Sequence, residues 1–427
     1  MSGFNFFKAA LFSLLVCYSP IAVGEKFIEF LTQMQNQAKE IDVEKAKYLA
    51  AKSRLDSVNA KYGTEATLLT QGGGEYAIKE KDKFKRHLST VTIKKPIFDL
   101  QRSYDRDGGK ISRDQQALQM RLVEIETLFQ NSTLYVDLVT SAEEVQTAKL
   151  ERDTYEDNYR STSRRFELGE INSSNVDQVK LTLERKRIDY SIADTNLEGK
   201  ILELQEILQK ISRNSVESMS LPILNLDTQA MSDAKIDQIL RRHPSYLKLE
   251  LAQKQNALDL RHSREYFDPK LYAETFYNFA NIDRQVTTDS IFVGLELNMT
   301  LYSGNSSFYE RQQAMQGHLE NKANIDLYLL KATQRIKREI FNIRENLKRQ
   351  VILDEVMKDS QILVDKTKKL YVEGYANSLE LINALTNVYT YRRQLSSNKA
   401  DIFRSKLLIM RTFGDLTLAN LKQRVKE

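Results

Sequence analysis

Cysteine, histidine, tryptophan, glycine and proline are all scarce in this chain of 427 residues. The one cysteine, Cys17, excludes a disulfide framework within the chain, and tryptophan is absent. The four histidines are scattered without a second ligand at metal-binding spacing, so we expect no metal site and no cofactor. The 15 glycines and 5 prolines are few enough to permit long uninterrupted helices.

The chain also lacks a large excess of charged residues of one sign. Lys and Arg number 63 and Asp and Glu number 58, which gives a net charge of +5. No basic face with interleaved aromatic residues stands out, so we expect no binding of nucleic acid. The sequence shows no nucleophile with a neighbouring base and no paired carboxylates in a glycine-rich context. We therefore expect that the protein is not an enzyme.

No apolar run in the chain is long enough for a membrane-spanning helix, so any spanning segments must be strands. Residues 1–24 instead resemble an export signal, with Lys8 as the only charge, a mostly apolar run at 9–16 and a small-residue cleavage site at 22–24. The residue before Cys17 is valine, which argues against a lipoprotein signal. We expect residues 1–24 to be a signal peptide.

The strongest pattern is an internal repeat with an offset of 205 residues, the separation of Gly169 from Gly374. The same offset pairs Asn172 with Asn377 and Ser173 with Ser378. The repeat predicts two halves joined by an equatorial linker at 213–234. The first half, 25–212, is expected to hold strands at about 62–100 and a helical hairpin at about 110–212. The second half, 235–427, is expected to hold strands at about 270–302 and a helical hairpin at about 305–414.

After each paired glycine, apolar residues recur in a heptad rhythm. The six pairs that step by seven are Val176/Leu381, Leu183/Val388, Tyr190/Leu395, Leu197/Ile402, Leu204/Ile409 and Ile211/Leu416. This rhythm predicts coiled-coil packing. A helix that contacts two neighbours in a wall needs a second apolar stripe, and Leu181, Ile188 and Leu202 begin one.

Each of these helices follows another long helical stretch, from about Ser112 to Leu168 and from about Ser307 to Val372. Glycine suits the left-handed position that ends a helix, so Gly169 and Gly374 predict the turns of two long helical hairpins. In the second turn, Asn377 and Glu380 have the spacing of a helix N-cap and its return partner.

Strands are predicted before each hairpin. From Ile291 to Leu301 apolar and polar residues alternate, and the expected partner strand runs from Leu271 to Ala280. About ten residues suffice to cross a bilayer when a strand is tilted. In the first half we expect strands at Glu65–Gln71 and Leu88–Phe98, with the three glycines at 72–74 as the tip of their loop. By pattern alone, a soluble β-hairpin with one buried face remains open.

The order strand, strand, helix, glycine turn and helix, given twice, resembles the TolC-like outer-membrane efflux protein family. The segments that carry the resemblance are Arg165–Val176, Tyr371–Gly374, Lys95–Phe98, Thr300–Gly304 and Asp268–Leu271. The fold class this implies is mainly α with a small β part: long α-helical hairpins in coiled-coil packing that form an α-barrel, and transmembrane strands.

The resemblance further implies a homotrimer in which four strands from each protomer close a 12-stranded barrel in outer-membrane lipid. The helices then continue across the periplasm, and the turns meet a periplasmic adaptor protein of an inner-membrane pump. The function implied is the exit duct of a tripartite efflux or type I secretion system. The docking residues implied are Leu168, Gly169, Asn172, Ser173, Gly374, Asn377 and Ser378.

Closed members of the family narrow the inner tip with acidic rings and a polar link between hairpins. By position Glu380 matches one ring acid, and Asn383 stands where the second is expected. Tyr371 matches the tyrosine of the link, but Asn175 and Ala376 replace its acidic and basic partners. At most a neutral hydrogen bond between Tyr371 and Asn175 is then expected, and helix capping is an equal explanation for Glu380.

A soluble or periplasmic coiled-coil scaffold is the main alternative. It accounts for the heptads, but it accounts neither for the export signal nor for the alternating strand at 291–301.

Overall fold

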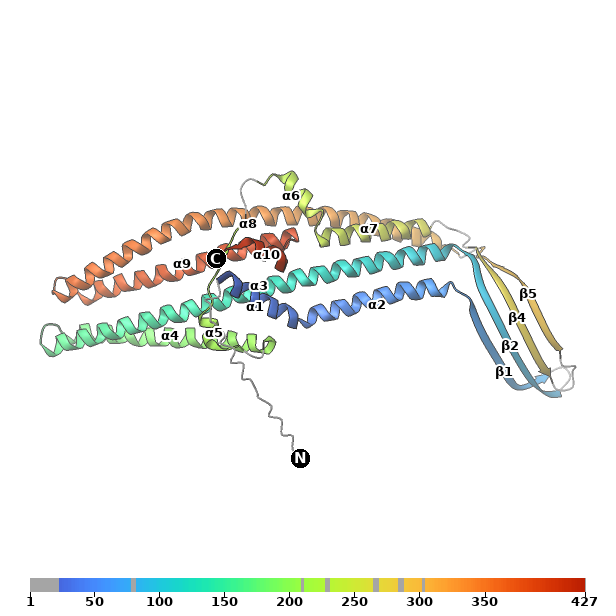
Figure 1. The fold of residues 1–427 in the computed structure, drawn as a ribbon, viewed down its shortest axis with the longest axis horizontal. Helices are drawn as coiled ribbons and strands as arrows, with labels where there is room; N and C mark the ends of the chain where they lie inside the picture. Colours follow the sequence, from blue (N-terminus) through green and yellow to red (C-terminus); the bar gives the residue numbers. More distant parts are fainter. Residues whose placement is uncertain are drawn as a thin grey trace, which may run out of the picture.

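The computed structural model describes residues 23–77, 82–208, 211–226, 231–263, 269–282, 288–301 and 304–426. The molecule is a long rod of helices with a curved sheet at one end and two helical turns at the other (Figure 1). The proposed signal segment up to residue 22, with Cys17, lies outside the described residues. No helix in the described part of the chain is long and apolar enough to cross a membrane.

The rod is a layer four helices wide. Two helices run almost its whole length, α3 (Leu100–Glu167) and α8 (Ser306–Val372). Near the sheet the order across the layer is α2, α3, α7 and α8, where α2 is Lys39–Lys61 and α7 is Pro244–His262. Near the turns the order is α4, α3, α9 and α8, where α4 is Ser173–Ile207 and α9 is Ser378–Phe413. The layer therefore has two edges, one formed by α2 and α4 and the other by α8.

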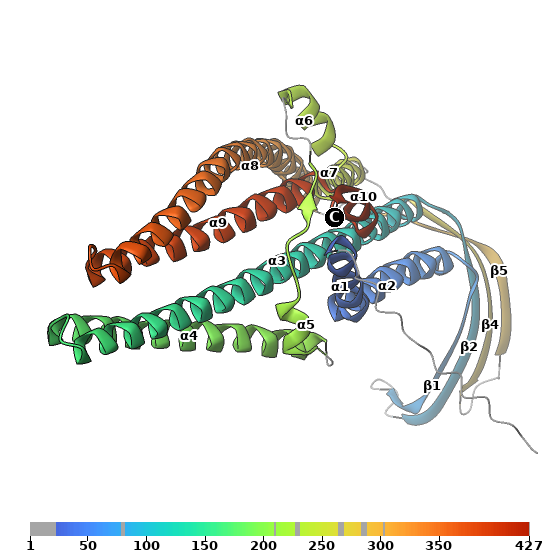
Figure 2. The same ribbon diagram turned by 60° about the vertical axis from the view of Figure 1, so that its left-hand side comes forward.

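Short elements form a belt around the middle of the rod, where α2 gives way to α4 and α7 to α9 (Figure 2). They are α1 (Val23–Gln37), α5 (Arg213–Glu217), α6 (Asp233–Leu240), α10 (Leu418–Arg424), and the paired strands β3 (Ile223–Leu224) and β6 (Val425–Lys426). The rings of Phe27 and Phe403 pack edge-to-face, as do those of Phe27 and Tyr135. This apolar cluster fixes the belt to α3 and α9.

The sheet has the order β1-β2-β4-β5, and every neighbouring pair is antiparallel. Its strands are β1 (Glu65–Ala77), β2 (Asp82–Asp99), β4 (Lys270–Ile282) and β5 (Thr288–Asn298). The prediction that Gly72–Gly74 form a hairpin tip is wrong, because these residues pair with Lys85–His87 of β2. Ladder hydrogen bonds come from the backbone, so a residue without a side chain can still take part in them.

Several other bounds differ from the sequence prediction. Helices α1 and α2 were not predicted, β2 begins at Asp82 instead of Leu88, and α3 begins at Leu100 instead of Ser112. Strand β5 ends at Asn298, so Met299 and Leu301 lie beyond it, and Ile211 lies beyond the end of α4. Element ends depend on contacts with other segments, which a local pattern does not contain.

Both halves of the chain have the element order helix, strand, strand, long helix and helix. Their bounds keep the offset of the glycine turns: β1 and β4 begin at residues 65 and 270, and α4 and α9 begin at residues 173 and 378.

Candidate functional site

The two turns at the end of the rod have the same backbone geometry. Gly169 and Gly374 have φ angles of 78° and 83°, so the predicted left-handed glycines are confirmed. In the first turn the N–H of Glu170 donates to the carbonyl of Arg165 at 2.9 Å; in the second, the N–H of Tyr375 donates to Leu370 at 2.8 Å. These bonds satisfy helix-end carbonyls and let both chains reverse sharply.

The next helix in each turn starts on an asparagine cap. The side chain of Asn172 accepts from the N–H of Asn175 at 3.2 Å, and that of Asn377 accepts from the N–H of Glu380 at 2.8 Å. The amide of Asn377 also donates to the Glu380 carboxylate at 3.2 Å, so the predicted capping pair is present. Both Glu380 and Asn383 are exposed and lie one turn apart on the same side of α9.

The expected hydrogen bond between Tyr371 and Asn175 is absent from the contacts of the described residues. The buried Tyr371 hydroxyl instead lies 2.8 Å from the Thr162 hydroxyl of α3. Arg165 donates from Nη1 to the Tyr371 carbonyl at 2.8 Å, and its guanidinium lies 4.9 Å from the centre of the Tyr371 ring. Its Nε donates to Glu170 at 2.8 Å, and this bond raises the pKa of Arg165.

Arg165 therefore joins the two hairpins. It lies close to Ala376, the residue that replaces the basic partner in the polar link expected between the hairpins. Sequence reasoning missed this role, because nothing in the local pattern tells which arginine beside the turn faces the other hairpin.

The hairpins meet along an inter-hairpin seam, in which α3 from Asp137 to Arg165 lies against α9 and the end of α8. Much of the seam is polar. The carboxylate of Glu151 is 1% exposed; its Oε2 accepts from Arg393 of α9 at 2.7 Å, and its Oε1 lies 2.8 Å from Lys186 of α4. Nearer the turns, the Tyr155 hydroxyl lies 2.9 Å from that of Thr386. The two hairpins are thus held in one register by specific pairs.

Arg393 also donates to Glu144 at 2.7 Å. Burial disfavours the charged form of Arg393, but the carboxylates of Glu144 and Glu151 outweigh this effect and raise its pKa. The guanidinium of Arg393 therefore stays charged at neutral pH.

The sheet has two chemically different faces. On one face Ile291, Val293, Leu295 and Leu297 of β5 are 72%, 75%, 65% and 62% exposed. Their cross-strand partners continue this face on β4, as Tyr277, Thr275, Ala273 and Leu271. The predicted alternation in this strand is confirmed, and its apolar face is exposed in the single chain.

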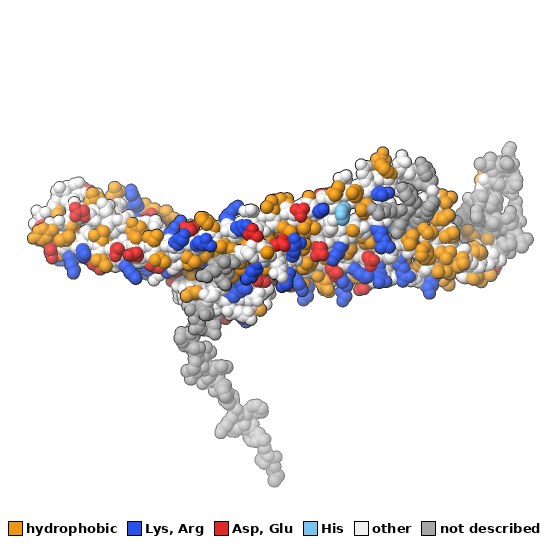
Figure 3. All heavy atoms as spheres, turned by 90° about the horizontal axis from the view of Figure 1, so that it is seen from above, with side chains coloured by type: hydrophobic (Ala, Val, Ile, Leu, Met, Phe, Trp, Pro, Cys, Tyr) orange, Lys and Arg blue, Asp and Glu red, His pale blue; other side chains and the backbone are white. Residues whose placement is uncertain are grey.

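The other face is polar. Lys94 of β2 lies 2.5 Å from Glu296 of β5, and Thr90 donates to Asn278 at 2.7 Å. Figure 3 shows hydrophobic side chains gathered at the sheet end of the rod, whereas charged side chains are mixed over the helices. A sheet with one apolar exposed face and one polar face suits a boundary between lipid and water.

No family model matches the sequence, and no curated protein matches it. Solved structures do match. One of them is CusC, which changes conformation as it folds and forms a transmembrane channel. It is 13% identical to this chain with a TM-score of 0.77, and the match covers 91% of this chain and 92% of CusC. The outer membrane channel CmeC of Campylobacter jejuni is 15% identical with a TM-score of 0.77, covering 100% and 98%. This chain has the fold of the outer-membrane channels.

The outer membrane protein VceC of Vibrio cholerae adds a third example, at 12% identity and a TM-score of 0.75, covering 92% of this chain and 98% of VceC. The TolC-like fold inferred from the glycine turns and the strand alternation therefore agrees with the solved structures. At these identities the likeness concerns the fold.

Proposed function

We propose that this protein is the outer-membrane exit duct of a tripartite efflux or type I secretion system. The exposed apolar face of the sheet is the observation that carries the proposal. Leu295 and Leu297 would meet lipid, and the Lys94–Glu296 pair on the opposite face would lie in a water-filled lumen. The channel fold supports the same reading.

The proposed assembly is a homotrimer with a 12-stranded barrel. Strands β1 and β5 lie at the edges of the sheet, and open edges are not tolerated in lipid. The helical layer has matching edges. On α4 the exposed apolar residues include Leu181, Ile188 and Leu202, and on α8 they include Phe341 and Val351. In the proposed trimer, α4 of one copy would contact α8 of the next, and β1 of one copy would pair with β5 of the next. Repeating these contacts with the same rotation would close a ring.

In this assembly each chain consists of two repeats of the same element order, and residues 213–234 join the two repeats as the equatorial linker. Residues 227–230 of that linker lie outside the described part. The rod would extend into the periplasm, and the turns at its far end would dock an adaptor that connects the duct to an inner-membrane pump. The turn residues with exposed side chains include Leu168, Asn172 and Tyr375.

Mass measurement in mild detergent tests the trimer. We expect three copies of the 49.5 kDa chain less its signal segment, and extraction from the outer-membrane fraction only with detergent. The variant Ile188→Glu should dissociate the trimer, because it places charge in an apolar contact between protomers. Arg187→Glu is the control: it changes a residue on a helix face that already carries Glu184, and it should leave the trimer intact. A monomer in the soluble fraction would favour the coiled-coil scaffold instead.

Ion selectivity tests the turn end as the pore entrance. Three exposed Glu380 side chains near one axis would favour cations over anions at low salt. In planar bilayers we expect Glu380→Gln to reduce this preference at about 0.1 M salt and to change little at about 1 M, where the Debye length is only about 3 Å.

Glu345→Gln, which removes a carboxylate paired with Lys348 on α8, is the matched control and should not alter selectivity. Unchanged selectivity in Glu380→Gln at low salt would assign Glu380 to helix capping alone.

A further inference from the structure

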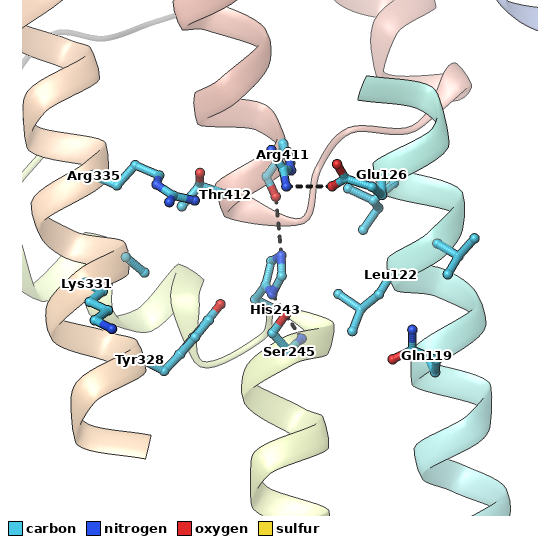
Figure 4. Close-up of a pocket in the computed structure, with 13 residues that line it drawn as sticks. Gln119, Leu122, Glu126, His243, Ser245, Tyr328, Lys331, Arg335, Arg411 and Thr412 are labelled. Atoms are coloured by element: carbon cyan, nitrogen blue, oxygen red, sulfur yellow. Dashed lines mark hydrogen bonds and ion pairs between the residues drawn. The ribbon is translucent and has the colours of Figure 1, made fainter. Parts of the chain in front are cut away.

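A recess opens at the belt, between α3 and α8, where α7 begins and α9 ends (Figure 4). Because Pro244 starts α7 and Phe413 ends α9, neither helix fills the layer at this level. The recess has a volume of about 460 Å³. A cavity of this size is in the range that holds a small organic molecule.

Positive charge predominates in the recess. Lys331 and Arg335 lie one turn apart on α8 and extend toward the recess from the same side (Figure 4). Arg411 of α9 pairs with Glu126 of α3 at 2.6 Å. Neither Lys331 nor Arg335 has an ion pair or hydrogen bond within the described part of the chain. Three cations and one carboxylate leave two positive charges without a partner.

His243 keeps the recess rigid without adding charge. Its Nδ1 accepts from the N–H of Ser245 at 3.0 Å, so its Nε2 carries the proton and faces the Arg411 carbonyl at 3.3 Å. Burial lowers the pKa of His243 and outweighs the hydrogen bond to the Arg411 carbonyl, which acts in the opposite direction; the charge of Arg411 adds to the lowering. The imidazole therefore stays neutral and ties the start of α7 to the end of α9.

Across the recess from Lys331 and Arg335, α3 contributes the apolar side chains of Leu122, Val123 and Ile125, beside Gln119 and Glu126. A bare inorganic anion would satisfy Lys331 and Arg335 but would leave this surface in contact with water. A molecule with an acidic group and a compact apolar body would satisfy both sides.

We propose that this recess binds small organic anions, in which one sulfonate, carboxylate or phosphate group is attached to an apolar body of one or two rings. Lys331 and Arg335 hold the acidic group, and the residues from α3 hold the apolar body. The binding residues named here belong to one chain, whereas a role of the recess in selecting exported cargo rests on the proposed function.

Calorimetric titration of naphthalene-1-sulfonate into the full-length protein in lipid nanodiscs tests the proposal, with empty nanodiscs as the blank. We expect saturable binding with one site per chain, and weaker binding as salt rises. Lys331→Gln and Arg335→Gln should each weaken affinity about fivefold, the effect of losing one partly solvated charge contact.

Arg338→Gln is the matched control, because it removes an exposed charge from α8 outside the recess and should leave the affinity unchanged. The neutral analogue 1-naphthol should bind at least about tenfold more weakly. Equal binding of the two compounds, equal effects of all three substitutions, or no saturable heat would overturn the proposal.

The mass of each variant in detergent and its conductance are measured alongside. Intact trimers that conduct but bind no naphthalene-1-sulfonate would reject the recess and leave the duct in place. Binding by a protein that is not a trimer would reject the duct and leave the recess in place.

Discussion

Replacing Arg393 with methionine should cost about 3–5 kcal/mol of unfolding free energy, the usual cost of leaving one partner of a buried ion pair behind. Glu151 is 1% exposed and would retain Lys186 as its one remaining cation partner, because Arg393 supplies the contact to Oε2. Urea titration of the circular dichroism signal in mild detergent measures the loss.

Two further variants make this result specific. Arg404→Met removes a cation from the same helix, but its partner Asp137 is 35% exposed and can be solvated, so the cost should stay near 1 kcal/mol or below. In the double variant Glu151→Gln/Arg393→Met the loss should be smaller than the sum of the two single losses. Equal costs for Arg393→Met and Arg404→Met would mean that water reaches Glu151.

Replacing Leu295 with arginine should cost roughly 2–4 kcal/mol, because the proposed barrel would place the charged group against the bilayer interior. Leu295 is 65% exposed in the single chain and lies on the apolar face of β5. The yield of heat-resistant trimer in outer-membrane extracts, together with guanidinium unfolding in lipid vesicles, measures the effect.

Asn298→Arg is the control, since residue 298 lies on the polar face three positions further along the same strand. We expect it to assemble nearly as well as the parent protein. If both arginine variants assembled equally well, the apolar face would not meet lipid.

Much of the fold could be predicted from sequence because its long elements carry strong local signals. The left-handed glycines at 169 and 374 fix both turns, and the alternation from Ile291 to Leu297 fixes a strand with two unlike faces. Helix α2 was missed for the opposite reason. Its buried side chains are only Glu44 and Leu55, so it has no apolar stripe that would have marked it as an element.

The polar contacts between hairpins could not be predicted from sequence. Along α3, residues 137, 144 and 151 step by seven and are all acidic, and they face arginines of α9 that lie more than 240 residues away. Heptad reasoning expects apolar residues at such an interface, and it does not reveal which distant cation meets which acid. Arg165 at the turn was missed for the same reason.

The sheet joins the two halves of the chain through β2 and β4, and this pairing affects how the protein reaches its folded state. Thr90 and its partner Asn278 are 188 residues apart in sequence. Pairing over such a separation closes a long loop and is slow compared with local hairpin formation. The β1–β2 hairpin must therefore wait for most of the chain to emerge, with an apolar face and two unpaired edges exposed. The exposed face and edges of this hairpin are therefore open to wrong pairing until β4 becomes available.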